Sequence, residues 1–231
     1  MLLNMNSWYE VKRFKSSGRV GRQLGNNLTD QCVVIFDNLK GEGLCNIHGC
    51  WKVNVDIVVR LRAALVCLDD DLSRLDLKNV KGEKGTLIMF LSNHCPFVKH
   101  VNGEIVRLAN EYRQLGFGFA GISSNDPESY PEDHPDLMTE AASKNQYSFP
   151  YLFDGTQEIA RKYQAACTPD FFLFDAELKL IYRGQLDDSR PNNGLHSNGR
   201  DIREAMDAVL NNRKVNKDQK PSIGCNIKWK T

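Results

Sequence analysis

The 231-residue sequence predicts an α/β domain with a mainly parallel central sheet and helices on both faces. Apolar runs at 85–92 and 118–123 are continuous, which is typical of strands buried on both faces. Segments with the 3.6-residue period of amphipathic helices alternate with these runs along the chain. The composition, 41% hydrophobic and 26% charged, is that of an ordinary globular protein.

The elements can be placed in order from residue 85 onward. The strand at 85–92 leads into a helix over 96–115, which Gly116 ends. After the strand at 118–123, a turn rich in Pro and Asp precedes a helix over 135–145, for which Asp133 is the expected N-cap. The first half of the domain therefore reads strand, helix, strand, helix.

The second half continues this alternation and closes with a hairpin. A short strand is expected at 149–154, and Asp154 with Gln157 resembles a capping box that opens a helix ending at Ala165. The apolar runs at 170–175 and 178–184 flank an Ala-Glu turn and predict a β-hairpin, and an amphipathic helix follows at 200–212.

The first 70 residues fit this pattern poorly. Strands are expected at 31–36 and 55–59, while 57–68 is compatible with a strand or a buried helix. We therefore expect three parts: an atypical, partly disordered segment (1–71), the α/β domain (72–212) and a polar C-terminal tail (213–231).

Charge and cysteine usage limit the classes of function. The net charge of +1 gives no electrostatic footprint for nucleic acid. The sequence contains no run of 18 apolar residues, so no membrane span is expected. The seven cysteines are odd in number and contain no C-x-x-C pair, which favours free thiols in a reducing compartment such as the cytoplasm. The basic residues within 1–29 leave a mitochondrial or plastid location as the alternative. The oligomeric state is left open.

The strongest chemical signal is the sequence Ser92-Asn93-His94-Cys95-Pro96, which lies where a buried strand ends and a helix begins. The carboxyl ends of strands carry the sites of open α/β sheets. The partial positive charge of a helix N-terminus lowers the pKa of a cysteine placed there, and the thiolate is the reactive form. Cys95 is therefore the candidate nucleophile, against the alternative of an inert buried cysteine.

Two groups of metal-ligating residue types occur in the sequence, and neither favours a metal site. Cys45, His48 and Cys50 are spaced too tightly for comfortable chelation, and no fourth ligand is evident. A site made of His94, Cys95 and His100 is equally disfavoured. No metal or other cofactor is expected.

Four blocks in order, MFLSNHCPFVKH, ACTPDFFLFD, YRGQLDDSRP and KPSIGCNIKWK, resemble the peroxiredoxin-like redoxins of the alkyl hydroperoxide reductase and thiol-specific antioxidant group. The resemblance covers about residues 72–230. It implies a thioredoxin-like three-layer α/β/α sandwich with a central mixed sheet and a closing β-hairpin.

The resemblance also implies roles for individual residues. Cys95 matches the family's nucleophile, and Ser92 matches the hydroxyl residue three positions before it. Thr168-Pro169 matches the loop whose cis-proline packs against that cysteine. Val98 stands where dithiol thioredoxins have their second cysteine, and Ile88 replaces the upstream proline of peroxiredoxins, so the peroxidase signature is incomplete.

The expected activity is that of a thiol-dependent, peroxidase-like antioxidant oxidoreductase. The Cys95 thiolate attacks a hydroperoxide or a disulfide, and a thiol reductant such as a thioredoxin or glutathione system restores it. His94 and Arg183 are candidates for stabilising the thiolate, and Cys167 and then Cys225 are candidates for resolving it. The alternatives are a redox-inactive binding module of the same fold and a cysteine-based redox sensor.

Overall fold

The computed structural model describes residues 63–64, 74–75 and 80–231 of the chain. The strands expected at 31–36 and 55–59, and the basic segment within 1–29, lie outside the described residues. Among the helices of the described part, none is both long and apolar enough to cross a membrane.

A five-stranded mixed sheet forms the centre of the domain, with strand order β5-β4-β3-β7-β8. Its strands are β3 (Gly85–Phe90), β4 (Phe117–Ser123), β5 (Tyr151–Phe153), β7 (Asp170–Asp175) and β8 (Leu180–Gly184). Strands β3, β4 and β5 run parallel, whereas β7 is antiparallel to β3 and β8 is antiparallel to β7. The expected central position of the 85–92 run and the closing hairpin are both confirmed.

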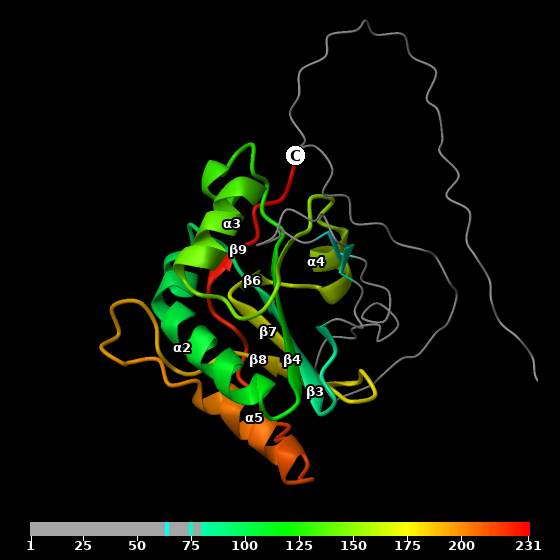
Figure 1. Ribbon diagram of the computed structural model, residues 1–231. Coiled ribbons are helices and arrows are strands. Elements are labelled where there is room, and N and C mark those ends of the chain that lie inside the picture. The colour runs from blue at the N-terminus through cyan, green and yellow to red at the C-terminus, as the bar shows by residue number, and fades with distance from the viewer. Residues whose placement is uncertain (1–62, 65–73, 76–79) are drawn as a thin grey trace, which may run out of the picture. The chain divides into compact units, whose positions relative to one another are not determined.

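Helices cover both faces of this sheet. The helices are α2 (Pro96–Arg113), α3 (Pro135–Lys144), α4 (Glu158–Tyr163) and α5 (Arg200–Leu210), with a 3₁₀ turn, η2, at Pro131–Asp133. Helices α2, α3 and α5 pack on one face and α4 packs on the other, as Figure 1 shows. The predicted three-layer α/β/α sandwich is confirmed.

The two cores follow from the alternation of side chains along β3. Leu87 and Met89 face the core shared with α2, whereas Ile88 and Phe90 face the core shared with α4. All four side chains are buried. A strand buried on both faces needs a continuous apolar run, and this is why the 85–92 segment could be predicted.

Two helix starts differ from the sequence-based expectation. The N-cap of α3 is His134, and Asp133 instead turns inward, where it is fully buried. The N-cap of α4 is Gln157, and the Asp154 carboxylate accepts hydrogen bonds from the backbone N–H of Ala160 and from Ser124. The Asp133 carboxylate therefore accepts from groups outside its helix, whereas the Asp154 carboxylate still accepts from an N–H in the first turn of α4, although Gln157 is the N-cap residue.

Two short antiparallel pairs lie outside the main sheet. Strand β1 (Ala63–Ala64) pairs with β2 (Arg74–Leu75), and β6 (Cys167–Thr168) pairs with β9 (Cys225–Asn226). The second pair brings the end of the chain back beside the centre of the molecule (Figure 1).

The segment expected to be a polar tail is therefore packed at its end. Ile227 is buried in the core that also contains α4. The backbone N–H of Asp126 donates to the carbonyl of Lys228 at 2.9 Å. Apolar side chains, among them Ile227, and backbone hydrogen bonds therefore hold the segment in place, and its polar composition concealed this packing.

Candidate active site

Cys95 lies at the start of helix α2, directly after strand β3. It is the N-cap residue, with an extended backbone (φ −64°, ψ 120°), and Pro96 occupies the first helical turn. Proline fits there because the first N–H groups of a helix have no intrahelical acceptor. The side chain of Cys95 is fully buried. The sequence-based placement of this cysteine at a strand–helix junction is correct.

Thr168 meets Cys95 from the other side of the site. The Cys95 Sγ donates to the Thr168 carbonyl oxygen at 3.0 Å, and the Thr168–Pro169 peptide bond is cis, as the resemblance implied. The Thr168 hydroxyl is buried and has no hydrogen-bond partner while the thiol is protonated. It is therefore available to donate to the sulfur once the proton has left.

The pKa of Cys95 lies below the ordinary value for a thiol, although the side chain is buried. Burial is the largest single influence and raises the pKa. It is outweighed by the Thr168 hydroxyl, by the backbone N–H groups of Val98 and Cys225, and by the Cys225 thiol, all of which favour the ionised sulfur. The site thus stabilises a thiolate with neutral donors.

A buried carboxylate, Asp133, organises the loop that precedes Cys95. It accepts hydrogen bonds from Ser92 Oγ at 3.1 Å, from the backbone N–H of Asn93 at 2.6 Å and from Asn125 Nδ2 at 2.7 Å. His94 Nδ1 lies 2.7 Å from the same carboxylate. Four groups on two loops therefore converge on one side chain.

These contacts revise the expected roles of Ser92 and His94. The Ser92 hydroxyl has one hydrogen, and this hydrogen is directed to Asp133 instead of to the Cys95 sulfur. His94 is committed to Asp133 through Nδ1, and its ring stacks on Tyr130 with the centroids 5.0 Å apart. Both residues position the loop, since a buried carboxylate is a stronger acceptor than a neutral thiol.

Of the two candidate resolving cysteines, Cys225 is the one in contact with Cys95. Thr168 is the register partner of Cys225, and the thiols of Cys95 and Cys225 lie close enough for each to shift the pKa of the other. Cys167 is buried and its Sγ donates to the Pro169 carbonyl oxygen at 3.5 Å. Burial raises the pKa of Cys167 to about 12, which leaves it a poor nucleophile in this state.

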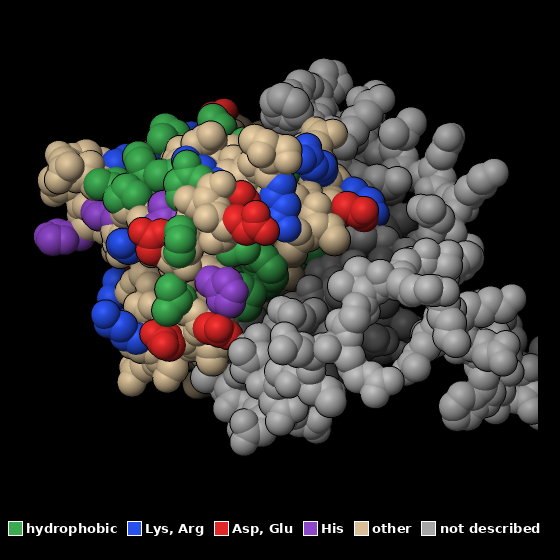
Figure 2. Space-filling view, turned by 90° about the horizontal axis from the view of Figure 1, so that it is seen from above, with side chains coloured by type: hydrophobic (Ala, Val, Ile, Leu, Met, Phe, Trp, Pro, Cys, Tyr) green, Lys and Arg blue, Asp and Glu red, His purple; other side chains and the backbone are tan. Residues whose placement is uncertain are grey.

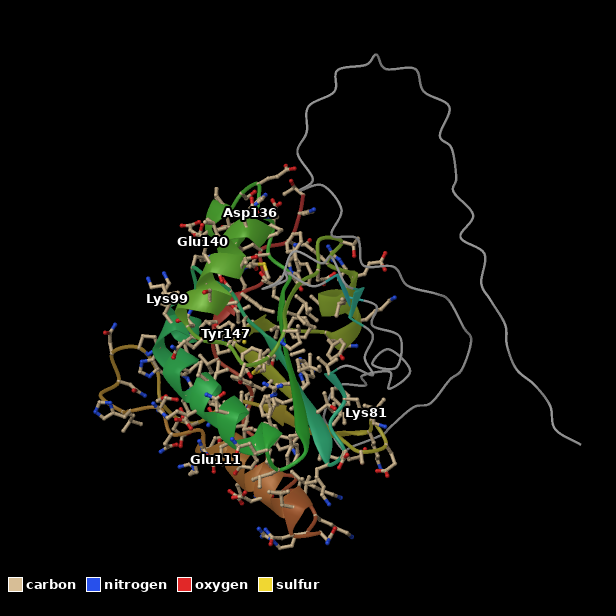
Figure 3. The ribbon with its side chains drawn as sticks, viewed as in Figure 1. Lys81, Lys99, Glu111, Asp136, Glu140 and Tyr147 are labelled. Carbon is tan, nitrogen blue, oxygen red and sulfur yellow. The ribbon has the colours of Figure 1, made fainter. Side chains whose placement is uncertain are left out.

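Two basic residues, Arg183 and Lys99, have contacts or positions away from the Cys95 sulfur. The Arg183 guanidinium lies 3.5 Å from the Asp170 carboxylate, donates to the Gln164 carbonyl oxygen and covers the ring of Phe172. These contacts place Arg183 near Cys167, whose pKa its charge lowers. They do not support its expected role at the Cys95 sulfur. Lys99 is exposed on the outer side of α2, as Figure 3 shows.

The sequence-based search missed Asp133 and Asn125 as parts of the site. Both lie in the loop region after β4, about 30 to 40 residues from Cys95 in the sequence. Their position in the sequence could have identified them. The loop that carries them follows β4, and the Cys95 loop follows the parallel neighbour β3, so both loops lie at the carboxyl ends of adjacent strands. Polar residues at the carboxyl ends of neighbouring parallel strands are expected to meet.

The described residues contain no group of three or more His, Cys, Asp and Glu side chains arranged to hold a metal ion. Cys45, His48 and Cys50 lie outside the described part of the chain.

The surface seen from above in Figure 2 has Lys and Arg interspersed with Asp and Glu, beside a cluster of hydrophobic side chains. The described residues of that face present no large area of one charge sign.

A buried cysteine at a helix start, facing a cis-proline loop in a three-layer sandwich, defines a thioredoxin-like thiol-redox domain. The redoxin family model matches residues 58–198. The chain belongs to the redoxin family, and its function is in general terms that of a thiol-redox protein.

Two solved structures are similar over most of the domain. An uncharacterized conserved protein from Geobacillus kaustophilus is 56% identical, with a TM-score of 0.70, over 73% of this chain and 88% of that chain. A hypothetical protein from Sinorhizobium meliloti 1021 is 40% identical, with a TM-score of 0.68, over 73% of this chain and 94% of that chain. No curated protein matches the chain.

Proposed function

We propose that this protein is a peroxiredoxin-like thiol oxidoreductase in which the Cys95 thiolate attacks a hydroperoxide or a disulfide. The observation that supports the proposal best is the environment of the sulfur. A fully buried thiol ordinarily has a raised pKa, yet the donors around Cys95 lower it. A site that opposes the effect of burial in this way favours the nucleophilic form of the cysteine.

The first step oxidises Cys95 in one of two ways. Attack on a hydroperoxide gives a sulfenic acid and releases an alcohol, or water when the oxidant is hydrogen peroxide. Attack on a disulfide gives a mixed disulfide and releases one thiolate. A thiol reductant, such as a thioredoxin or glutathione system, then returns Cys95 to the thiol.

The region through which a substrate would approach lies beside Pro169. A small hollow there is lined by Phe97, Arg190 and Ile223, among others. Ile223 is more than half exposed, whereas Cys95, which contacts the Thr168 carbonyl oxygen next to Pro169, is not exposed at all. We therefore expect substrate access to require a local displacement of the covering C-terminal residues, which favours small oxidants over folded protein disulfides.

Steady-state turnover tests the proposal. The purified full-length chain is mixed with hydrogen peroxide or with a small disulfide, in the presence of dithiothreitol or of a thioredoxin system, and oxidant consumption is followed. We expect turnover that Cys95→Ser abolishes and Cys167→Ser leaves within about twofold, because the pKa of the Cys95 thiol is lowered whereas that of the Cys167 thiol is raised.

The remaining outcomes separate the alternatives. Stoichiometric oxidation of Cys95 without turnover would identify a redox sensor. Absence of any Cys95 oxidation would favour a redox-inactive binding module and would reject the proposal.

A further inference from the structure

The C-terminal strand places a second thiol against Cys95. In the β6–β9 pair, Thr168 is opposite Cys225, and the same Thr168 carbonyl oxygen accepts the hydrogen bond from Cys95 Sγ. Both the backbone N–H and the thiol of Cys225 face the Cys95 sulfur. Residues 130 positions apart in the sequence thus form one dithiol site.

Contacts on both sides of Cys225 hold it there. Before it, the Ser222 hydroxyl donates to the Gly184 carbonyl oxygen at 2.7 Å. After it, Ile227 is buried, and the backbone N–H of Lys228 donates to Asn125 Oδ1 at 2.8 Å. The position of the second thiol is therefore fixed by the fold and does not depend on a chance encounter.

Gly224 makes this close approach sterically feasible. A Cβ added at Gly224 would lie 2.0 Å from the Thr168 carbonyl oxygen and 2.6 Å from its carbon. Both are backbone atoms of the strand that carries the cis-proline, so they have little room to move. Any side chain at position 224 would push the Cys225 strand away from Cys95.

The acidities of the two thiols differ in a way that suits sequential reaction. Burial, the hydrogen bond with Cys95 and the negative charge of Cys95 raise the pKa of Cys225 to about 11. Two of these three influences end when the Cys95 anion is consumed by an oxidant. Lys228, whose charge lowers the pKa of Cys225, remains. Oxidation of Cys95 therefore makes Cys225 easier to deprotonate at the moment when it is needed as a nucleophile.

We propose, building on the function proposed above, that Cys225 is the resolving residue and that the oxidised protein holds an intramolecular Cys95–Cys225 disulfide. In the hydroperoxide reaction, the Cys225 thiolate attacks the sulfur of the Cys95 sulfenic acid, an S–S bond forms, and the S–O bond breaks to release water. In the disulfide reaction, Cys225 attacks the Cys95 sulfur of the mixed disulfide and expels the second substrate thiol. Two thiols are oxidised and one oxidant molecule is reduced by two electrons in either case.

Cys167 is the matched comparison. It is the neighbour of Thr168 on β6, so its side chain points to the opposite side of that strand, and its Sγ is directed to the Pro169 carbonyl oxygen. A resolving role for Cys167 would require the strand to rotate, whereas Cys225 already interacts with the Cys95 sulfur.

Non-reducing peptide mapping tests the assignment. The reduced full-length chain receives one equivalent of hydrogen peroxide, free thiols are blocked, and linked peptides are identified by mass spectrometry. We expect a Cys95–Cys225 link in the wild type and in Cys167→Ser. In Cys225→Ser we expect no such link and a Cys95 sulfenic acid that dimedone traps.

A second variant keeps both thiols and changes only their placement. We expect Gly224→Ala to slow formation of the link by about 100-fold, the cost of misplacing a reacting group by about 1 Å. Circular dichroism verifies that the variant is folded. A rate equal to that of the wild type would contradict the argument from strand geometry.

The outcomes also separate this assignment from the function proposed above. A Cys95 sulfenic acid in the wild type with no link to Cys225, or a link to Cys167, would overturn the resolving role and leave Cys95 as the nucleophile. No oxidation of Cys95 at all would overturn both.

Discussion

The two sides of the Cys95 loop are held by different kinds of interaction. On one side, the buried Asp133 carboxylate fixes residues 92–94 through charge-assisted hydrogen bonds. On the other side, the groups that contact the Cys95 sulfur are neutral, and they include the Thr168 carbonyl and hydroxyl, the Val98 backbone N–H and the Cys225 thiol and backbone N–H. The comparison teaches that the charged contacts set the shape of the loop, whereas the neutral contacts leave the sulfur free to gain and lose charge.

The largest expected effect concerns the charged side. Asp133→Ala leaves four buried or half-buried donors without their acceptor, which we expect to lower the free energy of unfolding by about 3 kcal/mol. Urea denaturation measures this loss. The control is Asp136→Ala in the adjacent helix, where the carboxylate is 65% exposed and the expected change is below about 0.5 kcal/mol. A loss below about 1 kcal/mol for Asp133→Ala would show that the loop is held by other contacts.

The next effect concerns the coupling of the two thiols. Because the anion of Cys95 contributes to raising the pKa of Cys225 to about 11, Cys95→Ser should lower it, by roughly one to two units. The sign follows from the charge: without a neighbouring anion, Cys225 ionises at a lower pH. The ultraviolet absorbance of the thiolate, followed as a function of pH and compared with that of a Cys95→Ser/Cys225→Ser double variant, measures the shift. An unchanged titration of Cys225 would mean that the two sulfurs are uncoupled.

A smaller change is expected from the neutral donor. Thr168→Val removes the hydroxyl that favours the Cys95 thiolate and should raise the pKa of Cys95. The absorbance of the Cys95 thiolate should then appear at a higher pH than in the wild type. The matched control is Thr139→Val, since the Thr139 hydroxyl donates to a carbonyl within α3. A titration that is the same in both variants would assign the lowered pKa to the backbone donors alone.

The smallest effect is expected at Lys99. Its charge lies one turn into α2 but is exposed on the outer side of the helix (Figure 3), where solvent screens it. Lys99→Ala should therefore leave the Cys95 titration nearly unchanged. A larger shift would show that long-range charge contributes to the acidity of a site that otherwise contains neutral donors.

The sequence predicted the fold because the relevant signals are local. The continuous apolar run of β3 and the helical period of α2 each depend on neighbouring residues, and the structure confirms both. The capping signals were less informative. Asp133 and Asp154 have the residue type of an N-cap, but neither is the N-cap residue. Asp133 accepts hydrogen bonds from the Cys95 loop, because tertiary donors compete with the first turn of the helix, whereas Asp154 accepts from the Ala160 N–H within the first turn of α4.

The sequence alone determined the layer architecture, the position of Cys95 at a helix start and, through the resemblance, the cis-proline loop opposite it. Only the tertiary structure decided which groups surround the sulfur. Asp133 reaches the Cys95 loop because β3 and β4 are neighbouring parallel strands whose carboxyl ends meet. Cys225 reaches it because a polar segment at the end of the chain pairs with β6 by backbone hydrogen bonds, which leave no pattern in the side chains. Contacts between distant residues made through backbone groups have no signature in a single sequence, and the chemistry of this site depends on them.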